Sequence, residues 1–140
     1  YIHFINKDNE PIVLNFLEID LNLPELSLEV GTPHNQNILN STQRVSAMIT
    51  ARNNANDQKE VIAAINGDYF EFATGIPLGP VHKNNLQLKN TISSGYKYFG
   101  LLDNGNYMIG NSADYNTYQN RLIEVIGGRH LLIDKGDIVA

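Results

Sequence analysis

Residues that could carry chemistry gather in one short stretch, Asn66-Gly67-Asp68-Tyr69-Phe70. The Asn66 amide and the Asp68 carboxylate are two positions apart, so on an extended chain both side chains point to the same side. Such a pair can hold sugar hydroxyls, ligate Ca²⁺ or transfer protons in acid–base catalysis. Gly67 between them permits a close backbone approach or a positive φ angle. The residues alone leave a second interpretation open, a tight turn with no chemical role.

An apolar run over residues 61–65, Val-Ile-Ala-Ala-Ile, leads into this stretch. A short apolar run that stops at a turn signal predicts a buried strand. A loop with Gly75, Pro77 and Gly79 follows. The polar residues would then lie at the end of a strand, where a rigid scaffold can present them to a ligand.

The chain before this run predicts two strands and one helix. Residues 12–20 are strongly apolar, and residues 26–30 alternate between apolar and polar, so both predict strands. The helix is predicted over residues 40–52, with Asn40 or Ser41 as its cap and Gln43 in the capping-box position. Four residues at helical spacing form its inner stripe: Val45, Met48, Ile49 and Arg52.

The chain after Gly79 predicts a series of hairpins. Residues 81–82 pair with 86–88, and residues 98–102 pair with 107–109 across Asn104-Gly105, a strong hairpin signal. Residues 122–126 lead through Gly127-Gly128 into strands at 131–133 and 138–139, while residues 111–120 read as a surface loop. We therefore expect a single α+β domain over residues 1–140, mostly antiparallel sheet with hairpins and one main helix packed on it.

Composition excludes several classes of protein. The net charge of −5 and the pI near 5.2 argue against nucleic-acid binding. There is no cysteine, which excludes disulfides, thiolate zinc sites and cysteine nucleophiles. No apolar run approaches the roughly 18 residues that a membrane span needs. The start at Tyr1 fits a mature secreted protein or a fragment of a longer one equally well.

The motifs, taken in order, resemble the phosphodiester glycosidase family, the N-acetylglucosamine-1-phosphodiester α-N-acetylglucosaminidase-like ("uncovering enzyme") proteins. The resemblance begins at about residue 12 and reaches the end of the chain. It is carried by the motif at residues 66–70, the Gly75-Ile76-Pro77-Leu78-Gly79 loop, residues 98–105, and the Gly-Gly segment with its hairpin at residues 125–136.

This resemblance implies a hydrolase that releases a sugar, such as N-acetylglucosamine, from a sugar-1-phosphodiester. It implies Asp68 as the acidic catalytic or metal-binding residue and Asn66 as the amide that orients the substrate. Glu71 is the second candidate carboxylate, since the family often has an acid at this position. Glycoside hydrolysis normally uses two carboxylates, and the second one could instead lie in the remainder of the domain.

Further residues are candidates for substrate binding. Arg129 and His130 could receive a phosphate, with the glycine N–H groups before them forming an anion-binding nest, or could lie on a solvated turn. His82 could serve the site or be a structural histidine. Tyr69 could stack on a sugar, and four glycines would allow close backbone approach: Gly67, Gly79, Gly127 and Gly128.

In the family the domain continues beyond the motifs found here. The resemblance therefore implies the N-terminal portion of a larger domain, completed by its C-terminal remainder or by another chain, and a secreted or cell-surface location. Two other interpretations stay open. One is a non-catalytic carbohydrate- or cell-wall-binding module of the same fold, and the other is a structural fragment that helps another domain to pack. The expected partners are a sugar-1-phosphodiester or a cell-surface glycan.

Overall fold

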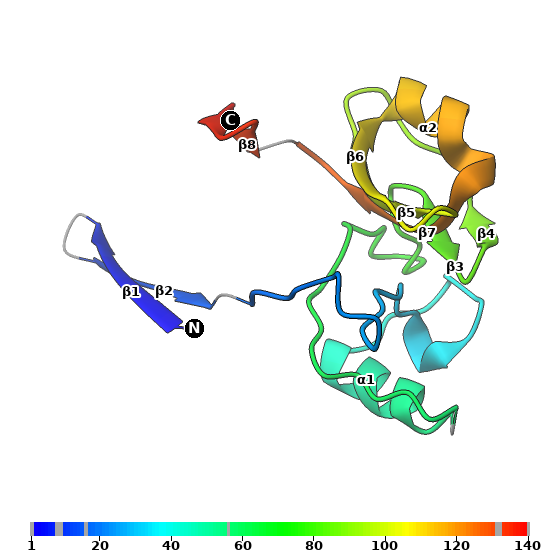
Figure 1. Ribbon diagram of the computed structural model, residues 1–140, viewed down its shortest axis with the longest axis horizontal. Helices are drawn as coiled ribbons and strands as arrows, with labels where there is room; N and C mark the ends of the chain where they lie inside the picture. Colours follow the sequence, from blue (N-terminus) through cyan, green and yellow to red (C-terminus); the bar gives the residue numbers. More distant parts are fainter. Residues whose placement is uncertain (1, 8–9, 16, 56, 131–132, 140) are drawn as a thin grey trace.

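A five-stranded antiparallel sheet in the order β4-β3-β7-β5-β6 forms the centre of the protein, which confirms the predicted α+β class. The computed structural model describes residues 2–7, 10–15, 17–55, 57–130 and 133–139. Figure 1 shows helix α2 beside the sheet, and helix α1 apart from it, below the sheet in this view. The strands of this sheet are β3 (Val81–Lys83), β4 (Leu86–Lys89), β5 (Lys97–Leu102), β6 (Tyr107–Asn111) and β7 (Leu122–Gly128).

Strand β7 is the central strand, and it pairs with β3 on one side and β5 on the other. The predicted hairpins β3–β4 and β5–β6 are confirmed. The Asn104-Gly105 turn joins β5 to β6, and Gly105 adopts the left-handed φ of +83° that favours glycine there. The apolar core lies on one face of this sheet and consists of Tyr98, Tyr115, Leu122 and Val125.

The surface loop predicted over residues 111–120 is wrong, because this segment contains helix α2 (Ser112–Tyr118) followed by a 3₁₀ turn, η2 (Gln119–Arg121). Asn111 and Asp114 form a capping box in which each side chain accepts from the other residue's backbone N–H. The helix places Tyr115 in the core, where its ring packs edge-on against Tyr98. Asn, Ser and Tyr residues suggested a loop, but here the polar ones cap a helix and the buried tyrosine anchors it.

Helix α1 (Val45–Asn53) is the predicted main helix, but it begins later than residue 40. Neither Asn40 nor Ser41 caps it: Arg44 occupies the N-cap position, without a side-chain cap. The Gln43 side chain instead accepts a hydrogen bond from the His34 backbone, at the 3₁₀ turn η1 (Pro33–Asn35) that contacts α1. That bond removes the predicted capping box.

Three of the predicted strands differ in the structure. Strand β2 (Glu10–Asn15) ends before residues 17–20, which have no regular structure. Residues 26–30 keep only part of the predicted alternation of burial: Ser27 is exposed and Val30 is buried, but Glu29 is half-buried like Leu28. They pair with no strand among the described residues. Residues 61–65 are also unpaired, and Ile62 and Ile65 are 71% and 81% exposed. Apolar composition alone does not make a strand where no neighbour accepts the backbone hydrogen bonds.

Two small hairpins lie at the ends of the chain. Strand β1 (Ile2–Lys7) pairs with β2, and β8 (Ile133–Asp134) pairs with β9 (Asp137–Ile138). Figure 1 shows both hairpins projecting away from the central sheet. Two residues of the predicted strand at 131–133 lie outside the described residues. Within the described part of the chain, no helix has the length and apolarity that crossing a membrane requires.

Candidate functional site

The Asp68 carboxylate lies in a niche made by two glycines from distant parts of the chain. Its Oδ2 atom accepts a hydrogen bond from the Gly79 backbone N–H. A Cβ atom on Gly79 would lie 2.7 Å from the Cα of Gly127 and 2.8 Å from Asp68 Oδ2, closer than atoms can pack. A side chain on Gly127 would likewise collide with the Asp68 carboxylate. The predicted motif, the glycine loop and the Gly-Gly segment thus meet at Asp68.

Only one of the two carboxylate oxygens of Asp68 has a partner. Oδ1 is buried and has no hydrogen-bond partner among the described residues. A buried polar atom without a partner is uncommon in folded proteins. Asp68 is therefore held through Oδ2 alone, while Oδ1 is buried in the niche away from solvent.

The loop between Asp68 and Gly79 is folded back on itself. Leu78 donates to the Tyr69 carbonyl at 2.8 Å, and Glu71 donates to the Ile76 carbonyl at 2.9 Å. Lys89 on β4 reaches the loop from outside and donates to the Leu78 carbonyl at 2.8 Å. These bonds fix the backbone that presents the Gly79 N–H to Asp68.

Glu71, the second predicted carboxylate, lies on the outer part of this loop. It is exposed, and its Oε2 accepts from the Thr74 hydroxyl at 2.8 Å. Asn66 is exposed as well and makes no side-chain hydrogen bond with the described residues. Gly67 does not have a positive φ. The predicted close approach of its backbone is present, since a Cβ on Gly67 would lie 2.8 Å from the Ile126 side chain.

An exposed arginine lies beside the niche, between two tyrosines. The guanidinium carbon of Arg129 is 5.8 Å from the ring centre of Tyr69 and 5.9 Å from that of Tyr96, within cation–π range. Tyr69 adjoins Asp68 in the chain and is 62% exposed. His130 is exposed next to Arg129. The sequence did not indicate that Tyr96 lies beside Arg129.

Gly127 and Gly128 do not form the predicted turn. Both belong to strand β7, opposite Tyr98 and Lys97 of β5. Successive N–H groups of an extended strand point to opposite sides, so these two cannot converge on one anion as a nest does. What the strand supplies instead is the bare backbone of Gly127 against Asp68.

His82 lies in the core and not at the niche. It is fully buried, its Nδ1 lies 3.0 Å from the Leu122 carbonyl, and its Nε2 lies 2.7 Å from the Tyr115 hydroxyl. The carbonyl can only accept, so Nδ1 carries the proton and Nε2 accepts from the tyrosine. Burial lowers the pKa of His82, which favours this neutral form. Both ring nitrogens are used inside the fold.

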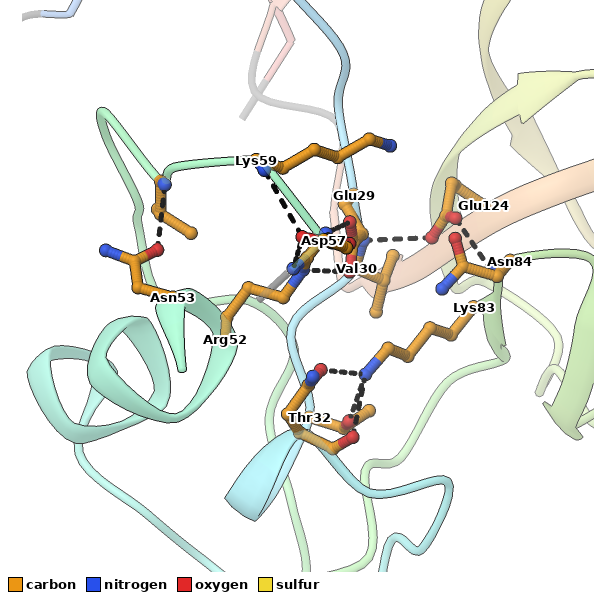
Figure 2. Close-up of polar contacts among 12 residues, drawn as sticks. Glu29, Val30, Thr32, Arg52, Asn53, Asp57, Lys59, Lys83, Asn84 and Glu124 are labelled. Carbon is orange, nitrogen blue, oxygen red and sulfur yellow. Dashed lines mark hydrogen bonds and ion pairs between the residues drawn. The ribbon is translucent and has the colours of Figure 1, made fainter. Parts of the chain in front are cut away.

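A second polar cluster, which the sequence did not reveal, lies where the segment around Val30 meets Glu124 of strand β7 (Figure 2). Lys83 is almost fully buried, and its Nζ donates to Thr32 Oγ1 at 2.9 Å and to Asn35 Oδ1 at 2.6 Å. Burial lowers the pKa of Lys83, because it removes water from around the charged ammonium. Among the described residues, no carboxylate forms an ion pair with it.

Glu124 and Arg52 complete this cluster. Glu124 accepts from the backbone of Val30 at 2.9 Å and of Asn84 at 2.7 Å, and burial raises the pKa of its carboxyl. Arg52 bridges Glu29 and Asp57, each at 2.8 Å, which raises the pKa of the guanidinium. A shallow polar hollow of about 280 Å³ is lined by Arg52, Glu29 and Asp57 together with Lys83 and Asn84. Because its buried groups bond to each other and to the backbone, the cluster joins α1 and residue 30 to the sheet.

The described residues do not assemble a metal centre. No group of three or more histidine, aspartate or glutamate side chains lies close enough together to hold a metal ion in this part of the chain. Asp68 is the sole carboxylate that we find at the niche among the described residues. Ca²⁺ needs several oxygen ligands, so the described residues do not support the Ca²⁺ prediction.

No protein-family model and no curated protein sequence matches this chain. The resemblance to phosphodiester glycosidases is therefore carried by the motifs alone, and it stays a prediction.

Proposed function

We propose that this chain carries a hydrolase site that releases a sugar from a sugar-1-phosphodiester. One observation carries the proposal: Asp68 is fixed against Gly79 and Gly127, and the next residue, Tyr69, has its ring 5.8 Å from the guanidinium of the exposed Arg129. A carboxylate beside a guanidinium suits a substrate that develops positive charge on its sugar and carries negative charge on its phosphate.

The proposed reaction breaks the bond between the anomeric carbon and the phosphate oxygen. The electron pair leaves with the phosphate monoester, and water supplies the new oxygen at the anomeric carbon. Asp68 stabilises the oxocarbenium-like transition state or takes the proton of the attacking water. Arg129 pairs with the departing phosphate through charge-assisted hydrogen bonds. A phosphate leaving group is already a stable anion, so it needs less help from a general acid.

Other residues would position the sugar. Tyr69 offers an exposed ring face for stacking, and the Asn66 amide can hydrogen-bond sugar hydroxyls. Glu71 is a candidate for the second carboxylate, although its loop holds it away from Asp68's closed niche. The proposal therefore includes a further polypeptide segment, from the same protein or another chain, that completes the site, and a secreted or cell-surface setting in which such substrates occur.

A second candidate function is a carbohydrate-binding module without catalysis. The buried, unpartnered Oδ1 of Asp68 favours it, because a carboxylate closed off from solvent does not reach a substrate without local movement. In that case Asp68 serves the fold, and the surface formed by the exposed Tyr69 and Arg129 and the half-buried Tyr96 binds the glycan by stacking and hydrogen bonds.

The test is sugar release from an α-N-acetylglucosamine-1-phosphodiester, by the chain alone and together with any polypeptide that co-purifies with it. If the chain is a hydrolase, we expect turnover of the phosphodiester, and we expect Arg129→Met to slow that turnover. The binding module predicts no turnover, with saturable binding of the same sugar that Arg129→Met also weakens. A folded sample that shows neither turnover nor binding would overturn both.

A further inference from the structure

Two Asn-Gly pairs occur in the chain, and the structure places them in opposite situations. They are Asn66-Gly67, at the candidate site, and Asn104-Gly105, in the β5–β6 turn. We propose that Asn66 is a site of spontaneous deamidation, a covalent modification that converts it to aspartate and isoaspartate, and that Asn104 is protected from it. Asparagine is among the chemically labile residues, and a following glycine leaves its side chain most open to attack.

The surroundings of Asn66 leave the reacting groups free. Asn66 and Gly67 are both exposed, and neither the Asn66 amide nor the Gly67 N–H makes a hydrogen bond with any described residue. Within the described part of the chain, the backbone from residue 62 to residue 68 takes part in no helix or sheet ladder. Local motion is least restrained where backbone hydrogen bonds are missing, so the attacking geometry is reached without opening structure.

The surroundings of Asn104 hold the same groups in place. The Gly105 N–H donates to the Leu102 carbonyl at 3.0 Å. Asn104 Oδ1 accepts from the Asn106 N–H at 3.1 Å. Both bonds must break before the Gly105 nitrogen can approach the Asn104 side chain.

The reaction needs only water. The Gly67 backbone nitrogen loses its proton to solvent base and attacks the Cγ of Asn66, so that a new N–Cγ bond forms. The Cγ–Nδ2 bond breaks, and Nδ2 leaves as ammonia after gaining a proton. Water then opens the cyclic imide at one of its two carbonyls, which gives aspartate or isoaspartate. The sum is amide plus water giving acid plus ammonia, with no change of oxidation state.

The packing of Gly67 explains why this liability is built into the fold. A Cβ at this position would lie 2.8 Å and 2.9 Å from two atoms of the Ile126 side chain, so a larger residue requires that side chain to move. The absence of a side chain at Gly67 permits the close contact with β7. It also leaves the Gly67 backbone nitrogen free to approach the Cγ of Asn66. Isoaspartate would insert one carbon into the backbone two residues before Asp68, and would thereby displace Asp68 from the Gly79 N–H.

The experiment is incubation of the folded chain at mildly alkaline pH, followed by peptide mapping with mass spectrometry and an isoaspartate-specific methyltransferase. We expect Asn66 to deamidate on the order of tenfold faster than Asn104, because two hydrogen bonds protect only the latter. The urea-unfolded chain is the control, and there the two sites should react at similar rates. The variant Asn66→Gln should lose the fast modification, because its longer side chain forms a ring much less readily.

A second readout follows the consequence for Asp68. Hydrogen exchange of the Gly79 amide should quicken in the isoaspartate fraction, and it should stay unchanged in material modified at Asn104 only. Loss of sugar release from the modified fraction is an additional expectation that rests on the proposed function, whereas the peptide map does not depend on any activity. Equal rates at the two sites in the folded chain, or faster reaction at Asn104, would overturn the proposal.

Discussion

Strand β7 and residues 61–65 both contain the apolar residues expected of a strand, yet only β7 is paired and buried in a sheet. Strand β7 lies between β3 and β5, and it buries Leu122 and Val125 almost completely. Residues 61–65 belong to none of the sheets formed by the described residues, and Ile62 and Ile65 face solvent. The difference shows that a strand depends on its neighbours at least as much as on its own composition.

The two regions meet at the candidate site. The segment after residue 65 touches β7 through Gly67 against Ile126 and through Asp68 against Gly127. The paired region therefore supplies a rigid wall, and the unpaired region supplies the candidate functional groups. Loops held on rigid scaffolds carry binding and catalytic residues in many proteins.

The largest expected difference between the two regions is in the cost of truncating an apolar side chain. Leu122→Ala should lower the free energy of unfolding by about 2–5 kcal/mol, the usual range for a buried leucine. Ile62→Ala should change it by no more than about 0.5 kcal/mol, as for an exposed site. Urea unfolding of both variants measures this, and similar losses would mean that residues 61–65 are buried in the folded protein.

The second largest effect that we expect comes from a substitution at the contact between the two regions. Gly127→Ala should cost about 1–3 kcal/mol, because its new methyl group collides with Gly79 and Asp68. Gly128→Ala is the matched control, since a Cβ there would lie 4.0 Å from the Lys97 carbonyl oxygen, an ordinary contact. Thermal unfolding compares the two. A Gly127→Ala variant as stable as Gly128→Ala would refute the described niche.

Removing a tyrosine hydroxyl should likewise cost more stability in the core beside β7 than in the exposed segment after residue 65. Tyr115→Phe leaves the buried Nε2 of His82 without its donor and should cost about 1–3 kcal/mol. Tyr69→Phe removes an exposed hydroxyl that bonds to no described residue, and should cost no more than about 0.5 kcal/mol. Denaturant midpoints of the pair report the difference, and equal midpoints would show that the hydrogen bond between His82 and Tyr115 contributes little.

The smallest effect that we predict is a pH dependence from His82. Burial lowers the pKa of His82 in the folded state, so the unfolded chain binds more protons around pH 6.5 and below. The free energy of unfolding should therefore fall as pH drops through about 6.5, with the His82 contribution fully present above it. His82→Gln should flatten that part of the stability profile. An unchanged slope in this variant would contradict the assignment.

The sequence predicted those parts of the fold that depend on neighbours in the chain. The Asn104-Gly105 hairpin and the β3–β4 hairpin follow from local turn residues and alternating strands. Helix α2 escaped prediction, although Asn111 and Asp114 stand at capping-box spacing before it. That spacing was the signal that could have revealed the helix.

The candidate site was predictable in its residues but not in its geometry. Asp68, Gly79 and Gly127 are all among the predicted residues, yet only the fold brings Gly79 and Gly127 to either side of one carboxylate. The position of Tyr96 beside Arg129, and the Lys83 and Glu124 cluster, depend on contacts between distant segments. Pairings over such distances leave no periodic trace in a single sequence.

The most direct test of the central claim compares sugar release by the unchanged protein, by Asp68→Asn and by Asp103→Asn. Asp103 is an exposed carboxylate paired with Arg121, so it is a matched control outside the niche. The account predicts that Asp68→Asn lowers kcat/KM at least about 10²-fold, the scale of a positioned catalytic group, without lowering Tm, while Asp103→Asn leaves the rate unchanged. A folded Asp68→Asn variant that releases sugar at the rate of the unchanged protein would contradict it.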